Sequence, residues 1–436
     1  MTTSATSDGG RKGAAAAGSP RLGRRFRVFQ AAVLSSDLAD GVYRVAVPLL
    51  ALQLTHSALA ISAVGVAMRM PWLLVTLPAG VVVDRYHPHR VLRAASWLRM
   101  PLVLLLAAAA FTGHLPVWAL ALGAFAVGAA GTVVDIAAQS LVPRLVDGAA
   151  LPRANASLQS VQTVMAQFLG PALGGVVAAL GAGGGIGTAT VLYVVTLLVL
   201  GGLRMPGEPA AAPRGGSPKS VLADLREGLG HFRSRRDLLH LAGVTACVNL
   251  AYAATITILP LWAVAPGRLG LPSWAYGVLL AAPAVGGVAA GRYAAKALTR
   301  FGGGSVLRVC APLVGLCYMA LAVPHVAAAA VALTVSGALL MAINVMSVTY
   351  RQTSIPPELF GRVNAAYRWI IWGVLPLGSL VAGLLADAFG VAWVFLCTGG
   401  LALATGLLRA PRLAAGTAAG PAAGTPADAP KAPSGS

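Results

Sequence analysis

The stretch LPVWALALGAFAVGAAGTVVDIAAQSLV, residues 115–142, decides the fold class. Asp135 is its one charged residue, and the stretch exceeds the roughly 20 residues that cross the core of a bilayer as a helix. It lacks the alternation of apolar and polar residues that is typical of a strand in a membrane barrel. We therefore predict that this stretch is a transmembrane helix.

Similar apolar stretches recur along the chain, six in each half, and predict an all-α membrane protein with twelve transmembrane helices in two six-helix pseudo-symmetric bundles. Apolar residues make up 57% of the sequence and charged residues 10%, where a soluble chain carries about 25%. This composition excludes an ordinary soluble enzyme and a disordered chain. The predicted spans are 28–53, 57–83, 91–112, 115–142, 154–180, 186–203, 238–264, 273–298, 305–323, 326–350, 363–386 and 390–409.

The predicted domain organisation follows these stretches. A shift of the sequence by 209 positions aligns Arg153 and Asn155 with Arg362 and Asn364, which indicates two related halves. The apolar residues at 222, 225, 229 and 232 have helical spacing and predict an amphipathic helix on the membrane surface. The expected segments are a disordered basic cytoplasmic tail (1–27), a first bundle (28–203), a cytoplasmic linker (204–237), a second bundle (238–409) and a disordered cytoplasmic tail (410–436).

The net charge of +19 predicts the orientation of the chain in the membrane. Most lysines and arginines lie in the tails and in loops expected on one side, whereas Arg268 lies in a loop expected on the other side. By the positive-inside rule, both termini are then cytoplasmic in a multi-pass protein of the bacterial plasma membrane. Because topology accounts for the basic residues, we expect no nucleic-acid partner.

Charged residues inside the predicted spans are candidates for function, because each costs about 2.5–3.5 kcal/mol at mid-membrane. Asp40 and Arg44 lie one helical turn apart. Two interpretations stay open: a proton-coupling site formed by Asp40, Arg44 and Asp135, or a fixed network of ion pairs, which is favoured for Asp37. Within the spans of the first half, the acids and bases away from the loops are equal in number, which suggests a paired network: Asp37, Asp40 and Asp135 against Arg44, Arg69 and Arg99.

Short motifs occur in a fixed order between residues 24 and 409. They are Asp40-Gly-Val-Tyr-Arg44, Gly80-Val-Val-Val-Asp84-Arg85 with Arg90, Asp135-Ile-Ala-Ala-Gln139, Gly170-Pro171-Ala-Leu-Gly174-Gly175 and Gly361-Arg362-Val. The ordered set resembles the major facilitator superfamily. Within it, the set is similar to the bacterial drug and siderophore exporters, the group of macrolide-efflux and enterobactin-exporter proteins.

This resemblance implies a secondary transporter that exports a drug or an amphipathic natural product by proton-coupled alternating access. It implies a latch between the halves, with Asp84 drawn to the start of a helix near Arg362; the alternative is a solvated loop acid. It implies that the glycine-rich motif either limits leak or only packs helices. The latch residues are Gly80, Asp84, Arg85, Arg90 and Arg362, and the packing residues are Gly170, Pro171, Gly174 and Gly175.

A candidate substrate cavity combines charged groups of the first half with aromatic and amide groups of the second. Such walls suit an amphipathic organic molecule, cations included, although each aromatic residue on its own is more typical of a core or an interfacial belt. The residues are Arg69, Arg99, Asn249, Tyr252, Asn344, Trp369 and Trp372.

We expect no enzyme activity, no cofactor and no metal site. The sequence contains no GxxxxGK[ST] loop for ATP and no HExxH, and its four cysteines have no CxxC spacing. The expected partners are a small amphipathic substrate, protons and the lipid bilayer, with the chain as a monomer. The alternatives are a siderophore or other metabolite transporter and, from another class, a membrane-embedded enzyme or receptor.

Overall fold

The computed structural model describes residues 23–203 apart from 180 and 182, residue 230, and residues 234–418. The secondary structure of this part is helical, with one isolated bridge between Val264 and Leu271. The predicted amphipathic helix at 222–232 lies outside the described residues but for residue 230. Helix extends further into the expected tails than predicted, because the first helix begins at Arg24 and the last ends at Ala418.

The described residues of the first half form six helical units. Two of the predicted spans are interrupted: 57–83 is divided between α2 and α3, and 154–180 contains a π-helical segment, η2. The elements are α1 (Arg24–Leu54), α2 (Ala58–Leu74), α3 (Thr76–Arg85), α4 (Pro88–Phe111), α5 (Val117–Leu145), η1 (Gly148–Ala150), α6 (Leu151–Gln162), η2 (Thr163–Leu169), α7 (Gly170–Ala178) and α8 (Gly184–Gly201).

The second half contains six continuous helices. In the described residues, ten helices are long and apolar enough to cross a membrane, or eleven if α2 and α3 count as one span. α1 is not among these helices, and its 31 residues include the charged Asp37, Asp40 and Arg44. The helices of the second half are α10 (Arg236–Ala263), α11 (Ser273–Phe301), α12 (Gly303–Ala320), α13 (Val326–Ser354), α14 (Pro357–Phe389) and α15 (Val391–Ala418).

Prolines explain both interruptions. Pro78 has no N–H for the carbonyl of Leu74, so the helix breaks at Val75 and α3 turns away from α2 by 43°. Pro171 likewise follows the wider turns of η2, where the Gly170 N–H reaches back five residues to Met165. Both breaks lie within the membrane-crossing units.

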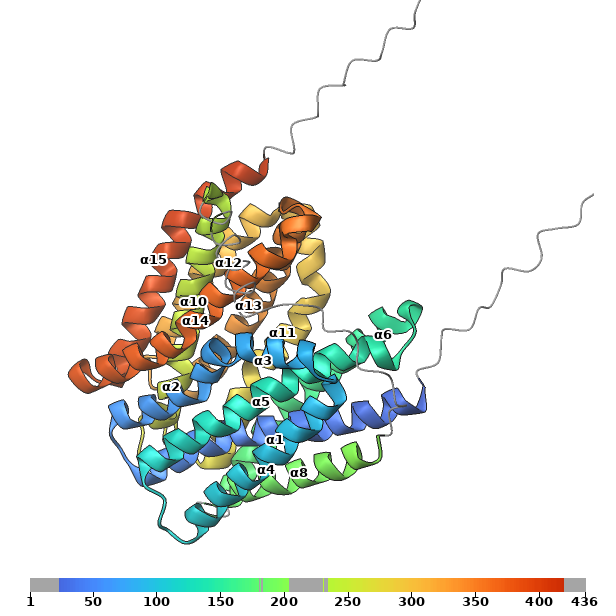
Figure 1. Ribbon diagram of the computed structural model, residues 1–436. Coiled ribbons are helices and arrows are strands. Elements are labelled where there is room, and N and C mark those ends of the chain that lie inside the picture. Colours follow the sequence, from blue (N-terminus) through green and yellow to red (C-terminus); the bar gives the residue numbers. More distant parts are fainter. Residues whose placement is uncertain (1–22, 180, 182, 204–229, 231–233, 419–436) are drawn as a thin grey trace, which may run out of the picture.

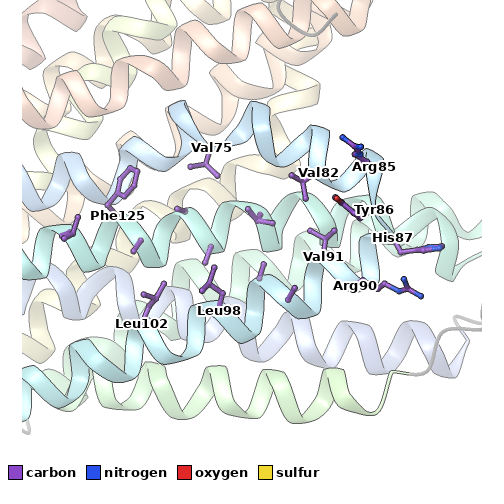
Figure 2. A pocket seen from close by; sticks show the side chains of 17 residues that line it. Val75, Val82, Arg85, Tyr86, His87, Arg90, Val91, Leu98, Leu102 and Phe125 are labelled. Atoms are coloured by element: carbon purple, nitrogen blue, oxygen red, sulfur yellow. The ribbon is translucent and has the colours of Figure 1, made fainter. Parts of the chain in front are cut away.

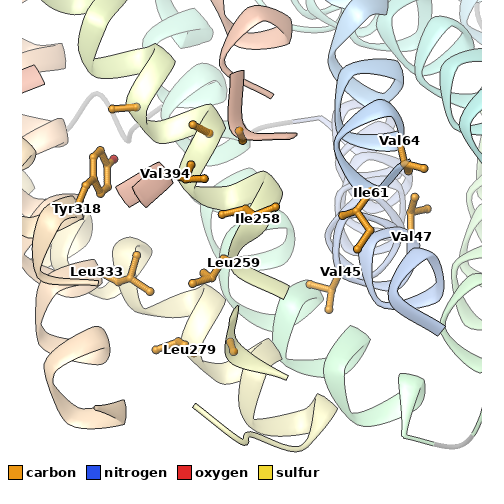
Figure 3. Close-up of a cluster of buried hydrophobic side chains, with 14 of the residues drawn as sticks. Val45, Val47, Ile61, Val64, Ile258, Leu259, Leu279, Tyr318, Leu333 and Val394 are labelled. Carbon is orange, nitrogen blue, oxygen red and sulfur yellow. The ribbon is translucent and has the colours of Figure 1, made fainter. Parts of the chain in front are cut away.

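The two halves meet at one side of the molecule and diverge toward the other. In Figure 1 the blue-to-green and yellow-to-red helices come together around α2 and separate toward the ends where α1 begins and α15 ends. We call this open side the terminal side and the other the opposite side. A buried apolar cluster joins the halves: Figure 3 shows Val45 and Ile61 of the first half with Ile258 and Leu259 of the second.

Glycines bring the halves into close contact near the opposite side. A Cβ atom on Gly175 of α7 would lie 2.8 Å from the Cα of Gly277 in α11, and one on Gly383 of α14 would lie 2.6 Å from the Cβ of Ser62 in α2. Only a missing side chain permits such backbone approach. These contacts hold the opposite side closed.

Candidate functional site

A polar cavity of about 210 Å³ lies inside the first half, beside the middle of α1. Both acids of α1 line it, and Asp135 comes from α5 on the facing wall. Trp72 of α2 forms its border toward the second half. The charged and polar lining residues are Asp37, Asp40, Tyr43, Arg44, Arg99, Thr132, Asp135 and Gln162.

Asp40 is the centre of this site. Its Oδ1 accepts from the guanidinium of Arg99 on α4 in an ion pair, and from the hydroxyl of Tyr193 on α8 at 2.7 Å. The Arg99 guanidinium also lies over the Tyr193 ring, 4.2 Å from its centroid. The ion pair is mostly buried, with the Arg99 side chain 7% exposed and that of Asp40 25% exposed. Three helices therefore hold one carboxylate at the edge of the cavity.

Small residues make room for the arginine. A Cβ atom on Gly131 of α5 would lie 3.2 Å from the Arg99 Cζ, so the guanidinium packs directly against the α5 backbone. The Nε of Arg99 is buried without a hydrogen-bond partner. A buried donor left unpaired costs free energy. The ion pair with Asp40 offsets this cost and holds the guanidinium in place.

The other two acids have no ion-pair partner within the described residues. Asp37 is 9% exposed and its Oδ2 is buried without a hydrogen-bond partner. Asp37 and Asp135 also line a second, smaller cavity of about 40 Å³, which runs from the polar cavity past Ser96 and Thr196. The two carboxyl groups thus lie between two hollow spaces.

These contacts correct the expected network of paired charges. Arg44 does not pair with Asp40; it is exposed and faces the cavity. Arg69 donates to the carbonyl of Gly65 in its own helix, at 3.1 Å. The partner of Asp40 is Arg99, which the sequence analysis placed in the substrate cavity. We favoured a fixed ion-pair network for Asp37, but Asp37 has no ion-pair partner within the described residues.

A third cavity, of about 330 Å³, lies between the halves next to the polar cavity. Trp72 lines both, and its ring meets the Trp372 ring edge-on at 4.7 Å. The Arg368 guanidinium covers the Trp372 ring at 4.7 Å. The lining residues are Trp72, Leu73, Thr76, Leu77, Gly80, Ile136, Gln139, Asn364, Ala365, Arg368, Trp369, Trp372 and Gly373.

Of the residues expected to bind substrate, Trp369 and Trp372 line this cavity and Arg99 lines the polar one. Four others are placed differently. Arg69 binds a carbonyl of its own helix, as described above. Asn249 donates to the carbonyl of Ile371 at 2.8 Å and so joins α10 to α14. Tyr252 packs against the apolar cluster, and the side chain of Asn344 is exposed. None of the four lines the three cavities described above.

The expected latch residues lie apart on the two halves. Asp84 and Arg85 are exposed at the end of α3, and Asp84 makes no hydrogen bond or ion pair within the described part of the chain. Gly80 lines the cavity between the halves, and Arg85 and Arg90 line a groove on the outer face of the first half. Arg362 is exposed near the start of α14. In this open shape, the cavity between the halves is lined by Gly80 of α3 on one side and by Asn364 of α14 on the other.

The glycine-rich motif lies where α7 crosses α1. A Cβ atom on Gly170 would lie 2.5 Å from the Cα of Gly41, and one on Gly174 would lie 2.9 Å from the carbonyl oxygen of Val42. Pro171 is buried between them, and Gly175 faces α11 of the other half. Side chains at these positions would push the helices apart.

Sequence reasoning missed three polar contacts. Tyr193 was passed over as part of an apolar span. The predicted span ended at residue 350, which left Arg351 in a loop, but α13 continues to Ser354. Arg351 is therefore buried; it donates to Asn364, and its guanidinium lies 4.1 Å from the centroid of the Tyr367 ring. Arg235 and Tyr350 both bind Asp237 at the terminal side, and the hydrogen bond to Asp237 raises the pKa of Arg235.

Comparison with known proteins matches these features to a family. The model of the family described as "transmembrane secretion effector" matches residues 15–427. The chain belongs to this family of major facilitator superfamily transporters. It is 30% identical over 401 residues to the multidrug efflux pump Tap of Mycobacterium tuberculosis, covering 88% of this chain and 92% of the pump. The Tap pump of Mycolicibacterium fortuitum is 29% identical over 389 residues, covering 84% and 90%.

Solved structures share the fold of this major facilitator protein. The nucleoside transporter NupG has a TM-score of 0.70 at 13% identity, covering 90% of this chain and 99% of that one. A bacterial homologue of ferroportin in its inward-facing state has a TM-score of 0.69 at 16% identity, covering 90% and 100%. The family and the fold make this chain a multi-span membrane transporter and not an enzyme.

Proposed function

We propose that this transporter exports amphipathic drugs or natural products from the bacterial cytoplasm by alternating access, driven by protons. One observation carries the proposal. The Asp40–Arg99 ion pair lies beside the middle of α1, on the wall of a polar cavity that adjoins the cavity between the halves. The similarity to pumps named as multidrug efflux pumps supports export of small molecules.

The orientation rests on charge. The loops and helix ends on the terminal side carry most of the basic residues, so this side faces the cytoplasm by the positive-inside rule. The open shape is then the one that takes up substrate from the cytoplasm. The same assignment makes 204–237 a cytoplasmic linker between the bundles 28–203 and 238–409, with cytoplasmic tails at 1–27 and 410–436.

The charge state of the site fits an exporter in this shape. We take the paired arrangement of Asp40 and Arg99 as the proton-free state of the cycle. When the halves rock, α7 transmits the motion from α11 to α1, which shifts Asp40 relative to Arg99 on α4 and Tyr193 on α8. A carboxylate that loses both partners binds a proton from the outer side. Asp135 and Asp37, beside the smaller cavity, give that proton a path toward the cytoplasm.

The substrate site is the cavity between the halves. Its volume is at the lower end of the range for drug-sized ligands, and its tryptophans offer flat apolar surfaces. Arg368 already covers the Trp372 ring on one side. An amphipathic molecule would pack its apolar body between Trp72 and Trp369 and direct its polar end toward the charges of the polar cavity.

We assign the terminal-side gate to Asp84 and the basic residues around it. Closing that side brings the end of α3 toward the start of α14, where Arg362 and the helix N-terminus attract an acid. The contacts of Gly170, Gly174 and Gly175 keep α7 close to α1 and α11 while the opposite side is shut.

The test is uptake of a fluorescent amphipathic cation such as ethidium into inverted membrane vesicles under an imposed pH gradient. Asp40→Asn and Asp135→Asn should each abolish uptake driven by the gradient, although neither should prevent dye binding. Asp387→Asn, which replaces an exposed acid at the far end of α14, should transport like the parent. Full gradient-driven uptake in both single variants would overturn the proposed proton coupling.

A further inference from the structure

A groove larger than the two cavities of the transport site lies elsewhere in the described part of the protein. It has a volume of about 940 Å³ and lies on the outer face of the first half, bounded by α3, α4 and α5. At its side α3 turns by 43° from α2 at Val75, and small alanine side chains form its floor. The alanines are Ala94, Ala95, Ala126, Ala129 and Ala130.

The two ends of the groove differ in chemistry. Figure 2 shows Leu102 and Phe125 at one end and Arg85, Tyr86, His87 and Arg90 gathered at the other. The basic end lies at the terminal side, and α4 begins there at Pro88, so the positive end of its helix dipole adds to the positive field. None of the described residues that line the groove is acidic. Such an end fits a phosphate group.

The length of the groove matches half of a membrane. Along α4 it runs from Arg90 to Leu102, about 18 Å at 1.5 Å per residue. One leaflet of a bilayer contributes about 15 Å of hydrocarbon. Exposed apolar side chains, such as Val82 at 41% and Leu98 at 61%, line the way. The groove therefore faces lipid, with its basic end at the depth of the headgroups.

We propose that this groove binds an anionic phospholipid from the leaflet on the terminal side. One acyl chain lies over the alanine floor, and the phosphate contacts Arg85 and Arg90. The lipid is separated from the transport cavity only by α3, whose other face contributes Thr76, Leu77 and Gly80 to that cavity. A bound lipid thus supports α3 from outside in the open shape.

The test measures bound lipid by native mass spectrometry, using protein from micelles that contain equal amounts of phosphatidylglycerol and phosphatidylcholine. The parent should retain phosphatidylglycerol preferentially. The double variant Arg85→Ala/Arg90→Ala should lower its occupancy about 30-fold, because each basic residue near a membrane surface contributes about fivefold. Arg93→Ala removes an exposed arginine of α4 that does not line the groove, and it should bind like the parent.

A second pair of variants tests the apolar part. Ala94→Trp fills the groove and should remove phosphatidylglycerol with both arginines in place. Ala108→Trp, at an exposed position of α4 outside the groove, should not. Equal loss or equal retention of the lipid in the members of either pair would overturn the proposal. So would displacement of the lipid by free glycerophosphoglycerol, which carries the same headgroup without acyl chains.

Discussion

Replacement of Asp40 by asparagine should destabilise the protein by more than replacement of its partner. Removing one member of a buried ion pair typically costs about 3–5 kcal/mol, because the other charge remains without compensation. Asp40→Asn leaves Arg99, whose side chain is 7% exposed. Arg99→Gln leaves Asp40, which is 25% exposed to the cavity and keeps the Tyr193 hydroxyl. We expect about 4 kcal/mol for Asp40→Asn and about 3 kcal/mol for Arg99→Gln.

The double variant separates a coupled pair from two independent sites. Asp40→Asn/Arg99→Gln removes both charges, so neither is left buried alone, and the total loss should be about 4 kcal/mol, well below the sum of the two. The assay is reversible unfolding of the purified protein by SDS in mixed micelles. The control cycle is Asp237→Asn and Arg235→Gln, a half-exposed pair for which we expect less than about 1 kcal/mol. Additive losses near about 7 kcal/mol would refute the reasoning.

The packing of the glycines and the gate at Asp84 give three more expected outcomes. Gly170→Ala should lower the free energy of unfolding by about 1–3 kcal/mol in the same assay, because its Cβ would lie 2.5 and 2.7 Å from backbone atoms. Gly400→Ala, whose Cβ would have nothing within 4 Å, should leave it unchanged. Equal effects of the two variants would contradict this account. Gly175→Ala should wedge α7 from α11 and favour closure of the terminal side, seen as a shorter distance between spin labels at Arg93 and Thr353; an unchanged distance would count against it. Asp84→Asn should slow dye transport without changing the free energy of unfolding, because Asp84 is exposed in this shape. Asp147→Asn, which replaces another exposed acid, should leave the transport rate unchanged. A parental rate for Asp84→Asn would contradict the role of Asp84 as a latch.

The fold could be predicted from the sequence because hydrophobicity and length suffice to identify membrane-crossing helices. The breaks within those helices could have been predicted too, from Pro78 and Pro171, but their consequences could not. Proline lacks a backbone N–H group, so its position in the sequence indicates where a helix can break. The direction in which α3 then turns depends on its packing against α5, and that direction creates the lipid-facing groove.

The candidate site was predicted residue by residue, but not as a set of contacts. Asp40 and Arg44 were expected to interact because they lie one turn apart on one helix. Helical spacing gives proximity only along a single helix, whereas the partners of Asp40 come from α4 and α8. The contact of Tyr193 could have been suspected, because its phenol lies inside an otherwise apolar span. The sequence was misleading for Arg351, because a basic residue near the end of a span is typical of a loop.

Backbone contacts link Asp40 to the joint between the halves. Asp40 is tied to α4 and α8, which lie away from the second half, and its backbone is tied through Gly41 to Gly170 at the joint with α7. Gly175, on the same α7, touches α11 of the other half. A rotation of the halves about that contact therefore reaches Asp40 through one rigid path of backbone contacts, α11 to α7 to α1. Side chains inserted at Gly175 or Gly170 would loosen this path without touching a charge. Variants at these glycines should thus uncouple dye movement from the pH gradient before they abolish dye binding.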